Sequence, residues 1–128
     1  MLTVALVLAS LAALLHVYIF VLESVRFTRP STLRVFGVRP DDVGAVRPWA
    51  FNQGWYNLFL AVQAFVGVVL VASGTVGVGV ALLVAGVGSM LAAALVLVGS
   101  DRRRARAAAT QGTIPALTLL ALLVHALV

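Results

Sequence analysis

Two ionisable side chains lie inside an otherwise apolar stretch near the N-terminus, and both could transfer protons. His16 and Glu23 are seven residues apart, so in a helix they share one face. Such groups within a membrane segment usually face the bundle interior or a water-filled cavity. Two simpler alternatives are an ion pair between Glu23 and Arg26 and a hydrogen bond from His16 across helices. Two helical turns separate His16 from Glu23, so we predict no metal site.

Side-chain amides form a second group, in the stretch FNQGWYNLFLAVQ (Phe51–Gln63). At about 100° per residue, four amides and one phenol fall within an arc of about 140°. Trp55 falls on the other side of the helix, together with Phe51 and Phe65. The pattern predicts a polar face turned into the bundle and an aromatic face turned to lipid. The polar face carries Asn52, Gln53, Tyr56, Asn57 and Gln63.

A third polar stripe, near the C-terminus, carries Gln111, Pro115 and Thr118. In alternating helices, Glu23, the first amides of the second span and Gln111 reach similar depth, with His16 about 10 Å further in. Together these groups predict a pocket that opens toward the cytoplasm. Interhelical hydrogen bonding, worth about 0.6–2 kcal/mol per contact, is the simpler alternative for each amide. The predicted ligand-binding residues are His16, Glu23, Asn52, Gln53, Tyr56, Asn57, Gln63 and Gln111.

The composition determines which elements must hold these groups. Of the 128 residues, 62% are hydrophobic and 10% charged, with a mean hydropathy of +1.13, whereas soluble domains average about 25% charged. We therefore predict an integral membrane protein with a single domain, 1–128. The expected spans are about 2–25, 51–72, 79–98 and 108–127, with Pro48 as the first helical residue of the second. Residues 26–50 form an amphipathic loop with a short interfacial helix near residues 33–36. A cleaved signal peptide is the disfavoured alternative for the first span, which has no basic residue before Arg26.

Arginine distribution predicts the topology. All nine basic residues are Arg, five in the first loop and four in the third. Short Arg-rich loops stay cytoplasmic, so both termini should face outward. The predicted fold is an all-α, up-and-down four-helix bundle whose arginines contact anionic lipid headgroups rather than nucleic acid.

Small residues recur every four positions in the third span, as Gly77, Ala81, Ala85, Ser89 and Ala93. Such a ridge lets another helix backbone approach closely. Packing within the chain is the favoured interpretation, and a homodimer interface is the alternative. The chain has no cysteine, which excludes disulfides and thiol chemistry, and we predict no cofactor.

Three stretches, HVYIFVLE (His16–Glu23), NQGWYNLFLA (Asn52–Ala61) and QGTIPA (Gln111–Ala116), together with Phe36 and Gly37, resemble an uncharacterised bacterial membrane family. That family is catalogued as domain of unknown function thirteen-oh-four. The resemblance covers the whole chain and implies a small four-span protein, here in the bacterial cytoplasmic membrane. It implies no activity. Its motif positions correspond to His16, Glu23, Asn52, Gln53, Gly54, Tyr56, Asn57, Gln111, Gly112 and Pro115.

Three classes of function stay open at this level. The first is a binder or carrier of a small amphiphilic or lipid-like molecule, since the pocket combines apolar walls with a few polar groups. The second is a membrane enzyme, of isomerase or hydrolase type, that uses Glu23 or His16 as its catalytic residue. The third is a structural or accessory membrane subunit.

Overall fold

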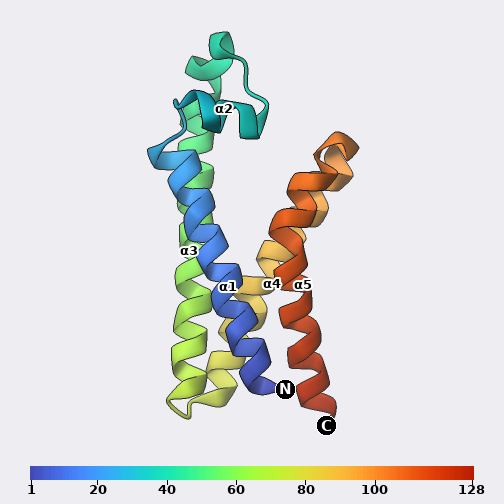
Figure 1. Cartoon of the computed structure of the whole chain (residues 1–128). Coiled ribbons are helices and arrows are strands. Elements are labelled where there is room, and N and C mark those ends of the chain that lie inside the picture. The colour runs from blue at the N-terminus through green and yellow to red at the C-terminus, as the bar shows by residue number, and fades with distance from the viewer.

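The computed structural model describes all 128 residues, and it contains helices and no strands. Four long helices, α1 (Leu2–Phe20), α3 (Val43–Ala72), α4 (Val76–Ser100) and α5 (Ala105–Leu127), run alternately up and down (Figure 1). Helices α1 and α4 each pack against both α3 and α5, so the four form a ring in chain order. All four are long and apolar enough to cross a membrane. The prediction of an all-α protein with four long apolar helices is confirmed.

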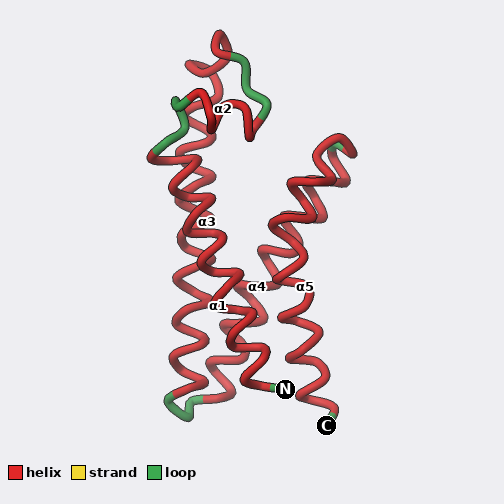
Figure 2. Tube along the Cα trace, viewed as in Figure 1, coloured by secondary structure: helices red, strands yellow, loops and turns green.

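Short helical turns and loops connect the long helices, and a non-helical turn joins α3 to α4 (Figure 2). A π-helical turn, η1 (Val21–Val25), continues α1, and the short helix α2 (Pro30–Phe36) follows it. Two single 3₁₀ turns, η2 (Pro40–Asp42) and η3 (Arg102–Arg104), lead into α3 and α5. Helix α2 lies where the sequence predicts the interfacial helix, and Gly37 ends it with a left-handed φ of 64°.

The second span differs most from its predicted bounds. Helix α3 begins at Val43, so Pro48 lies inside the helix rather than at its first position. Its 30 residues correspond to a length of about 45 Å, longer than the hydrocarbon core of about 30 Å. The helix is thus longer than a membrane core requires, and Pro48 lies close to its start.

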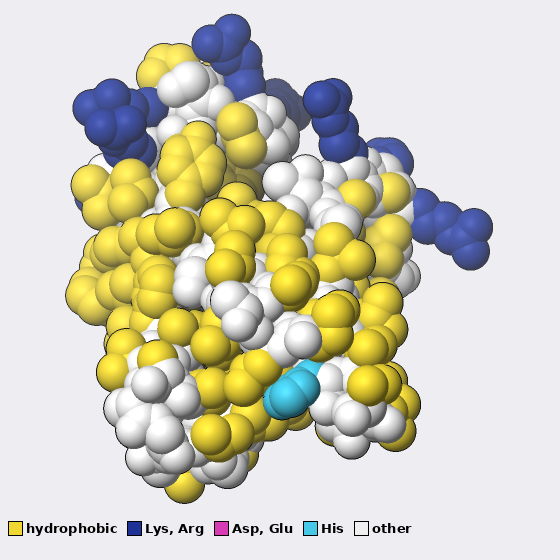
Figure 3. All heavy atoms as spheres, turned by 60° about the horizontal axis from the view of Figure 1, so that its bottom comes forward, with side chains coloured by type: hydrophobic (Ala, Val, Ile, Leu, Met, Phe, Trp, Pro, Cys, Tyr) yellow, Lys and Arg dark blue, Asp and Glu magenta, His cyan; other side chains and the backbone are white.

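The surface of the molecule matches a membrane-embedded protein. Only 25 of 128 residues are buried, and large apolar side chains are exposed along all four long helices. Apolar patches of that extent are rare on soluble monomers. The arginine side chains gather at one end of this apolar body (Figure 3). Both arginine-bearing segments, residues 26–47 and 102–106, lie at the end opposite the two termini (Figure 1).

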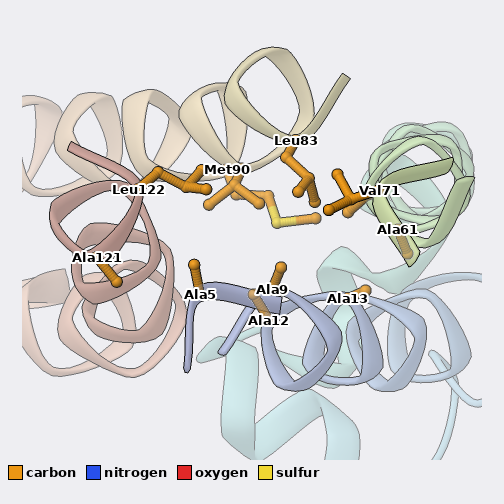
Figure 4. Packing of buried hydrophobic residues seen from close by; sticks show 12 residues of the cluster. Ala5, Ala9, Ala12, Ala13, Ala61, Val71, Leu83, Met90, Ala121 and Leu122 are labelled. Atoms are coloured by element: carbon orange, nitrogen blue, oxygen red, sulfur yellow. The ribbon is translucent and has the colours of Figure 1, made fainter. Parts of the chain in front are cut away.

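Alanine residues form much of the buried core. The buried face of α1 carries Ala5, Ala9, Ala12 and Ala13, which face Met90 and Leu83 of α4 across the bundle (Figure 4). His16 is buried on the same face, so the predicted inward face of the first span is confirmed. Side chains as small as alanine let helix backbones approach, which favours dispersion contacts where lipid supplies no hydrophobic driving force.

Helices α3 and α4 pack tightly against each other, and glycine residues permit this close contact. A Cβ atom added at Gly67 would lie 2.9 Å from the carbonyl oxygen of Gly79 and 2.9 Å from Cγ of Leu83. One added at Gly79 would lie 2.7 Å from the backbone nitrogen of Val71. Because backbone atoms cannot yield as a flexible side chain can, both positions require glycine.

The small-residue ridge of α4 does not take part in this packing, so its assignment to packing within the chain is wrong. Its members Gly77, Ala81, Ala85, Ser89 and Ala93 are all exposed. The buried face of α4 instead carries Gly79, Leu83, Gly86, Val87, Met90 and Ala94. The period of four placed the small residues on one face correctly, but the neighbouring helices contact the face that can combine glycines with large apolar side chains.

We predict that Gly67→Ala destabilises the folded protein by about 1–3 kcal/mol, because the added methyl group is forced against the backbone of α4. Gly88→Ala is the matched control, since a Cβ atom at Gly88 meets nothing within 4 Å. It should leave the stability unchanged or raise it by up to about 1 kcal/mol through helix propensity. Equilibrium unfolding of the purified protein in mixed micelles measures both, and equal effects would contradict the predicted α3–α4 contact.

Candidate functional site

All four helices pack together only at the end of the bundle that carries the termini. Toward the arginine-bearing end, the pair α1 and α3 diverges from the pair α4 and α5 (Figure 1). A cavity of about 790 Å³ lies in this opening. Pockets that hold one small molecule have volumes of about 300–1,000 Å³. We refer to this cavity as the cleft.

The side of α1 and η1 toward the opening is apolar. It carries Leu15 and Ile19 of α1 and Leu22 of η1, which line the cleft. Helix α4 adds Leu97 to this lining. The inner wall of the cleft is therefore apolar.

Glu23 lies at the polar end of this apolar wall, in the π-helical turn η1. Its Oε2 accepts a hydrogen bond of 2.9 Å from Nδ2 of Asn57 on α3. Asn57 also donates to the backbone carbonyl of Gln53, at 3.2 Å. Glu23 forms no ion pair, so the expected alternative pairing with Arg26 does not occur. The sequence analysis placed Glu23 and Asn57 near each other, and they meet here because η1, which continues α1, is in contact with α3.

Close contact between η1 and α3 fixes the position of Glu23. The hydroxyl of Ser24 donates a 2.8 Å hydrogen bond to the carbonyl oxygen of Phe51. Gly54 lies directly beneath, and a Cβ atom there would overlap with Oγ of Ser24 and lie 3.1 Å from Cβ of Glu23. The rings of Phe20 and Trp55 meet edge to face beside them, with centroids 5.2 Å apart. Trp55 therefore contacts α1 as well as forming part of the aromatic surface.

His16 is placed differently from Glu23. It is buried, and its Nδ1 lies 2.9 Å from the carbonyl oxygen of Ala12, one turn earlier in the same helix. It is absent from the lining of the cleft. His16 thus lies at the level of the cleft-lining Leu15 and Ile19, but on another side of α1, where it is buried.

The expectation of one inward-facing polar arc on the second span is wrong for three of its five members. Asn52, Gln53 and Tyr56 are exposed and do not line the cleft. The buried face of α3 consists instead of Gly54, Ala61, Ala64, Gly67 and Val71. Small residues take the contact face because they allow close packing, and the exposed amides lie in the early turns of the long helix, near the membrane surface. Their assignment to ligand binding stays a prediction.

Two further predicted residues reach neighbouring helices. Gln63 is half-buried, with its Nε2 3.5 Å from the carbonyl oxygen of Leu82 on α4. Gln111 is half-buried and lines the cleft opposite α1. Gly112 supports its position, because a Cβ atom there would lie 2.8 Å from that of Ala94, so α5 packs tightly on α4 at this level. His125 is exposed and apart from the cleft.

Charged residues that were not among the predicted site residues line the mouth of the cleft. They are Arg34, Asp101, Arg103, Arg104 and Arg106. Their loops were predicted to share one side of the membrane, and this was the signal available in the sequence. Their convergence depends on how α2 folds back over the opening (Figure 1).

Asp101 organises the α4–α5 side of the mouth. Its Oδ1 accepts hydrogen bonds from the backbone nitrogen and Nε of Arg103, at 3.0 and 3.1 Å. These bonds lower the pKa of the Asp101 carboxyl group from its usual value, so it is charged at neutral pH. Across the opening, Nη1 of Arg104 lies 3.4 Å from the carbonyl oxygen of Phe36, at the C-terminal end of α2. A cation is favoured at that end of a helix.

No three His, Cys, Asp or Glu side chains come close enough together to hold a metal ion. The chemical resources of the cleft are the carboxylates of Glu23 and Asp101, the amide of Gln111, the hydroxyl groups of Tyr18 and Thr110, guanidinium groups at the mouth and an apolar wall.

Comparison with known proteins identifies a family that matches this chain. The family model described as protein of unknown function (DUF1304) matches residues 10–123. The chain belongs to this family. The match includes Glu23, Asn57 and Gln111, as well as the arginines of the mouth, and it confirms the resemblance noted in the sequence. Searches of curated proteins and of solved structures gave no match.

We predict that Asn57→Leu destabilises the protein by about 1–3 kcal/mol, because it removes the only side-chain donor to the half-buried Glu23 carboxylate. Gln53→Leu is the control, one turn earlier on the same helix and exposed. It should change the free energy of unfolding by no more than about 0.5 kcal/mol. Thermal unfolding in detergent measures the stability of both variants. A larger loss of stability in Gln53→Leu than in Asn57→Leu would support the inward-facing polar arc that the sequence predicts.

Proposed function

We propose that this protein binds or carries a small amphiphilic or lipid-like molecule in the cleft. The observation that carries the proposal is the distribution of chemistry along the cleft. Apolar side chains of α1, η1 and α4 line its inner part, Glu23 and Gln111 add polar groups to the lining, and arginines surround the mouth. A molecule with an apolar body and a polar end matches that order.

The orientation of the cleft follows from the arginines. All nine arginines belong to two segments at one end of the molecule. By the positive-inside rule, that end faces the cytoplasm, so in a bacterial cytoplasmic membrane the cleft opens to the cytoplasmic side. A ligand would then enter from the inner leaflet or from the cytoplasm, with its polar end among the arginines.

A membrane enzyme is a second candidate, and Glu23 is the observation that favours it. π-Helical turns occur frequently at functional sites, and this one presents a carboxylate to a cavity without a cationic partner. Glu23 would then transfer a proton to or from an amphiphilic substrate, as in an isomerase or a hydrolase. His16 contributes less to this candidate, since it is buried and does not line the cleft.

We predict that Leu22→Trp abolishes binding of single-chain amphiphiles by filling the cleft. Leu14→Trp is the matched control, on the same helix but 56% exposed and away from the cleft. Native mass spectrometry of the protein with added amphiphiles measures the bound fraction, and thermal unfolding confirms that both variants fold. Equal binding by Leu22→Trp and the unchanged protein would refute a ligand site in the cleft.

An accessory subunit or homodimer is the third candidate, and it rests on the exposed small-residue ridge of α4. We predict that Ala85→Leu shifts the protein from dimer to monomer without lowering its unfolding temperature, because Ala85 contacts no helix of its own chain. Gly86→Leu should instead destabilise the fold, since a Cβ atom at Gly86 lies 3.4 Å from the backbone of α3. Size-exclusion chromatography with light scattering measures the mass, and a protein that is monomeric before mutation excludes this candidate.

A further inference from the structure

The charges that line the cleft are unequal in number. Four guanidinium groups, those of Arg34, Arg103, Arg104 and Arg106, line it, against the two carboxylates of Glu23 and Asp101. The lining therefore carries an excess of two positive charges. A phosphate monoester carries about 1.5 to 2 negative charges at neutral pH, whereas a carboxylate carries one. Charge balance favours the monoester.

The excess is located on two arginines from separate elements that line the cleft. Asp101 pairs with Arg103 at 3.1 Å and with Arg104 at 3.9 Å. The side chain of Arg34, on α2, bonds only the carbonyl oxygen of Pro30 in its own helix, at 3.4 Å. The side chain of Arg106, on α5, makes no hydrogen bond or ion pair. Two guanidinium groups from separate elements thus remain without an acid, and guanidinium groups form strong paired hydrogen bonds with phosphate oxygens.

Glu23 and Gln111 add polar groups to the lining. Gln111 follows Arg106 by five residues along α5, which places it about 7.5 Å further from the mouth. Glu23 also lines the cleft, and a carboxylate that is charged can only accept hydrogen bonds. The matching ligand group at this depth is a hydroxyl donor. Below it, Leu15 lies about 12 Å further along α1, so the remaining lining suits one hydrocarbon chain.

We infer that the cleft takes a single-chain amphiphile in which a hydroxyl group separates the hydrocarbon chain from a phosphate monoester. The phosphate lies between Arg34 and Arg106, the hydroxyl donates to Glu23 opposite Gln111, and the chain follows Leu22, Ile19 and Leu15. This inference rests on the proposed function and specifies its ligand class.

Four probes test the inference on the full-length protein, with dissociation constants from native mass spectrometry. A lysophosphatidic acid has all three parts, hexadecyl phosphate lacks the hydroxyl, a monoacylglycerol lacks the phosphate, and inorganic phosphate lacks the chain. We expect the lysophosphatidic acid to bind most tightly. Hexadecyl phosphate should bind about tenfold more weakly, because it lacks the hydroxyl group that would donate a hydrogen bond to Glu23. The monoacylglycerol should bind about ten- to hundredfold more weakly, and inorganic phosphate should not compete.

Variants assign these differences to residues. Arg34→Gln combined with Arg106→Gln should weaken lysophosphatidic acid binding at least tenfold and leave monoacylglycerol binding unchanged. Glu23→Leu should remove the difference between lysophosphatidic acid and hexadecyl phosphate. Arg39→Gln is the control for lost charge, since Arg39 pairs with Asp41 and does not line the cleft. It should bind every probe as the unchanged protein does.

The failures are distinguishable. Equal binding of monoacylglycerol and lysophosphatidic acid would overturn the phosphate assignment and leave the proposed function standing. Equal binding of hexadecyl phosphate would overturn the hydroxyl assignment alone, and competition by inorganic phosphate would indicate a site for the free ion. If no amphiphile binds, both the inference and the proposed function fall.

Discussion

Helices surrounded by lipid gain little from leaving it, so they hold together where their backbones come close enough for dense contact. In this protein that contact runs through Ala5, Ala9 and Ala12 of α1 and through Gly67 and Gly79 between α3 and α4. The closed half of the bundle consists of these approaches, with Leu83 and Met90 filling the centre. Toward the arginine-bearing end the helix pairs diverge and leave the cleft between them (Figure 1).

The polar groups occupy places that this packing leaves for them. Glu23 is held by Asn57 and by the tight contact of Ser24 with Gly54, so one carboxylate is fixed in the lining of the cleft, beyond the apolar side chains of Leu15, Ile19 and Leu22. The arginines lie beyond it, where side chains can reach water and lipid headgroups. An apolar wall, a hydrogen-bonding level and a cationic mouth thus follow one another along the cleft, and this order is the basis for assigning an amphiphilic ligand.

Helical periodicity in the sequence predicted the buried face of α1 correctly and most of the buried face of α3 wrongly. On α1 the small residues and His16 fall on one face, so small size and polarity indicate the same buried side. On α3 they indicate different sides, since Asn52, Gln53 and Tyr56 are exposed while Gly54 and Ala61 are buried. The prediction gave polarity precedence over size. Close packing decided the outcome, because the small residues of α3 take its contact face and leave the early amides exposed.

By itself, the sequence determined four long apolar helices, their order, the family, and the placement of every arginine in two connecting segments. These depend on local composition and on hydropathy summed over each span. Only the tertiary structure decided which face of α4 is buried, which amides meet a partner, and that Arg34 and Arg106 line the same opening as Glu23. Such features depend on how helix pairs pack against each other over their whole length, and no single helical period contains that information.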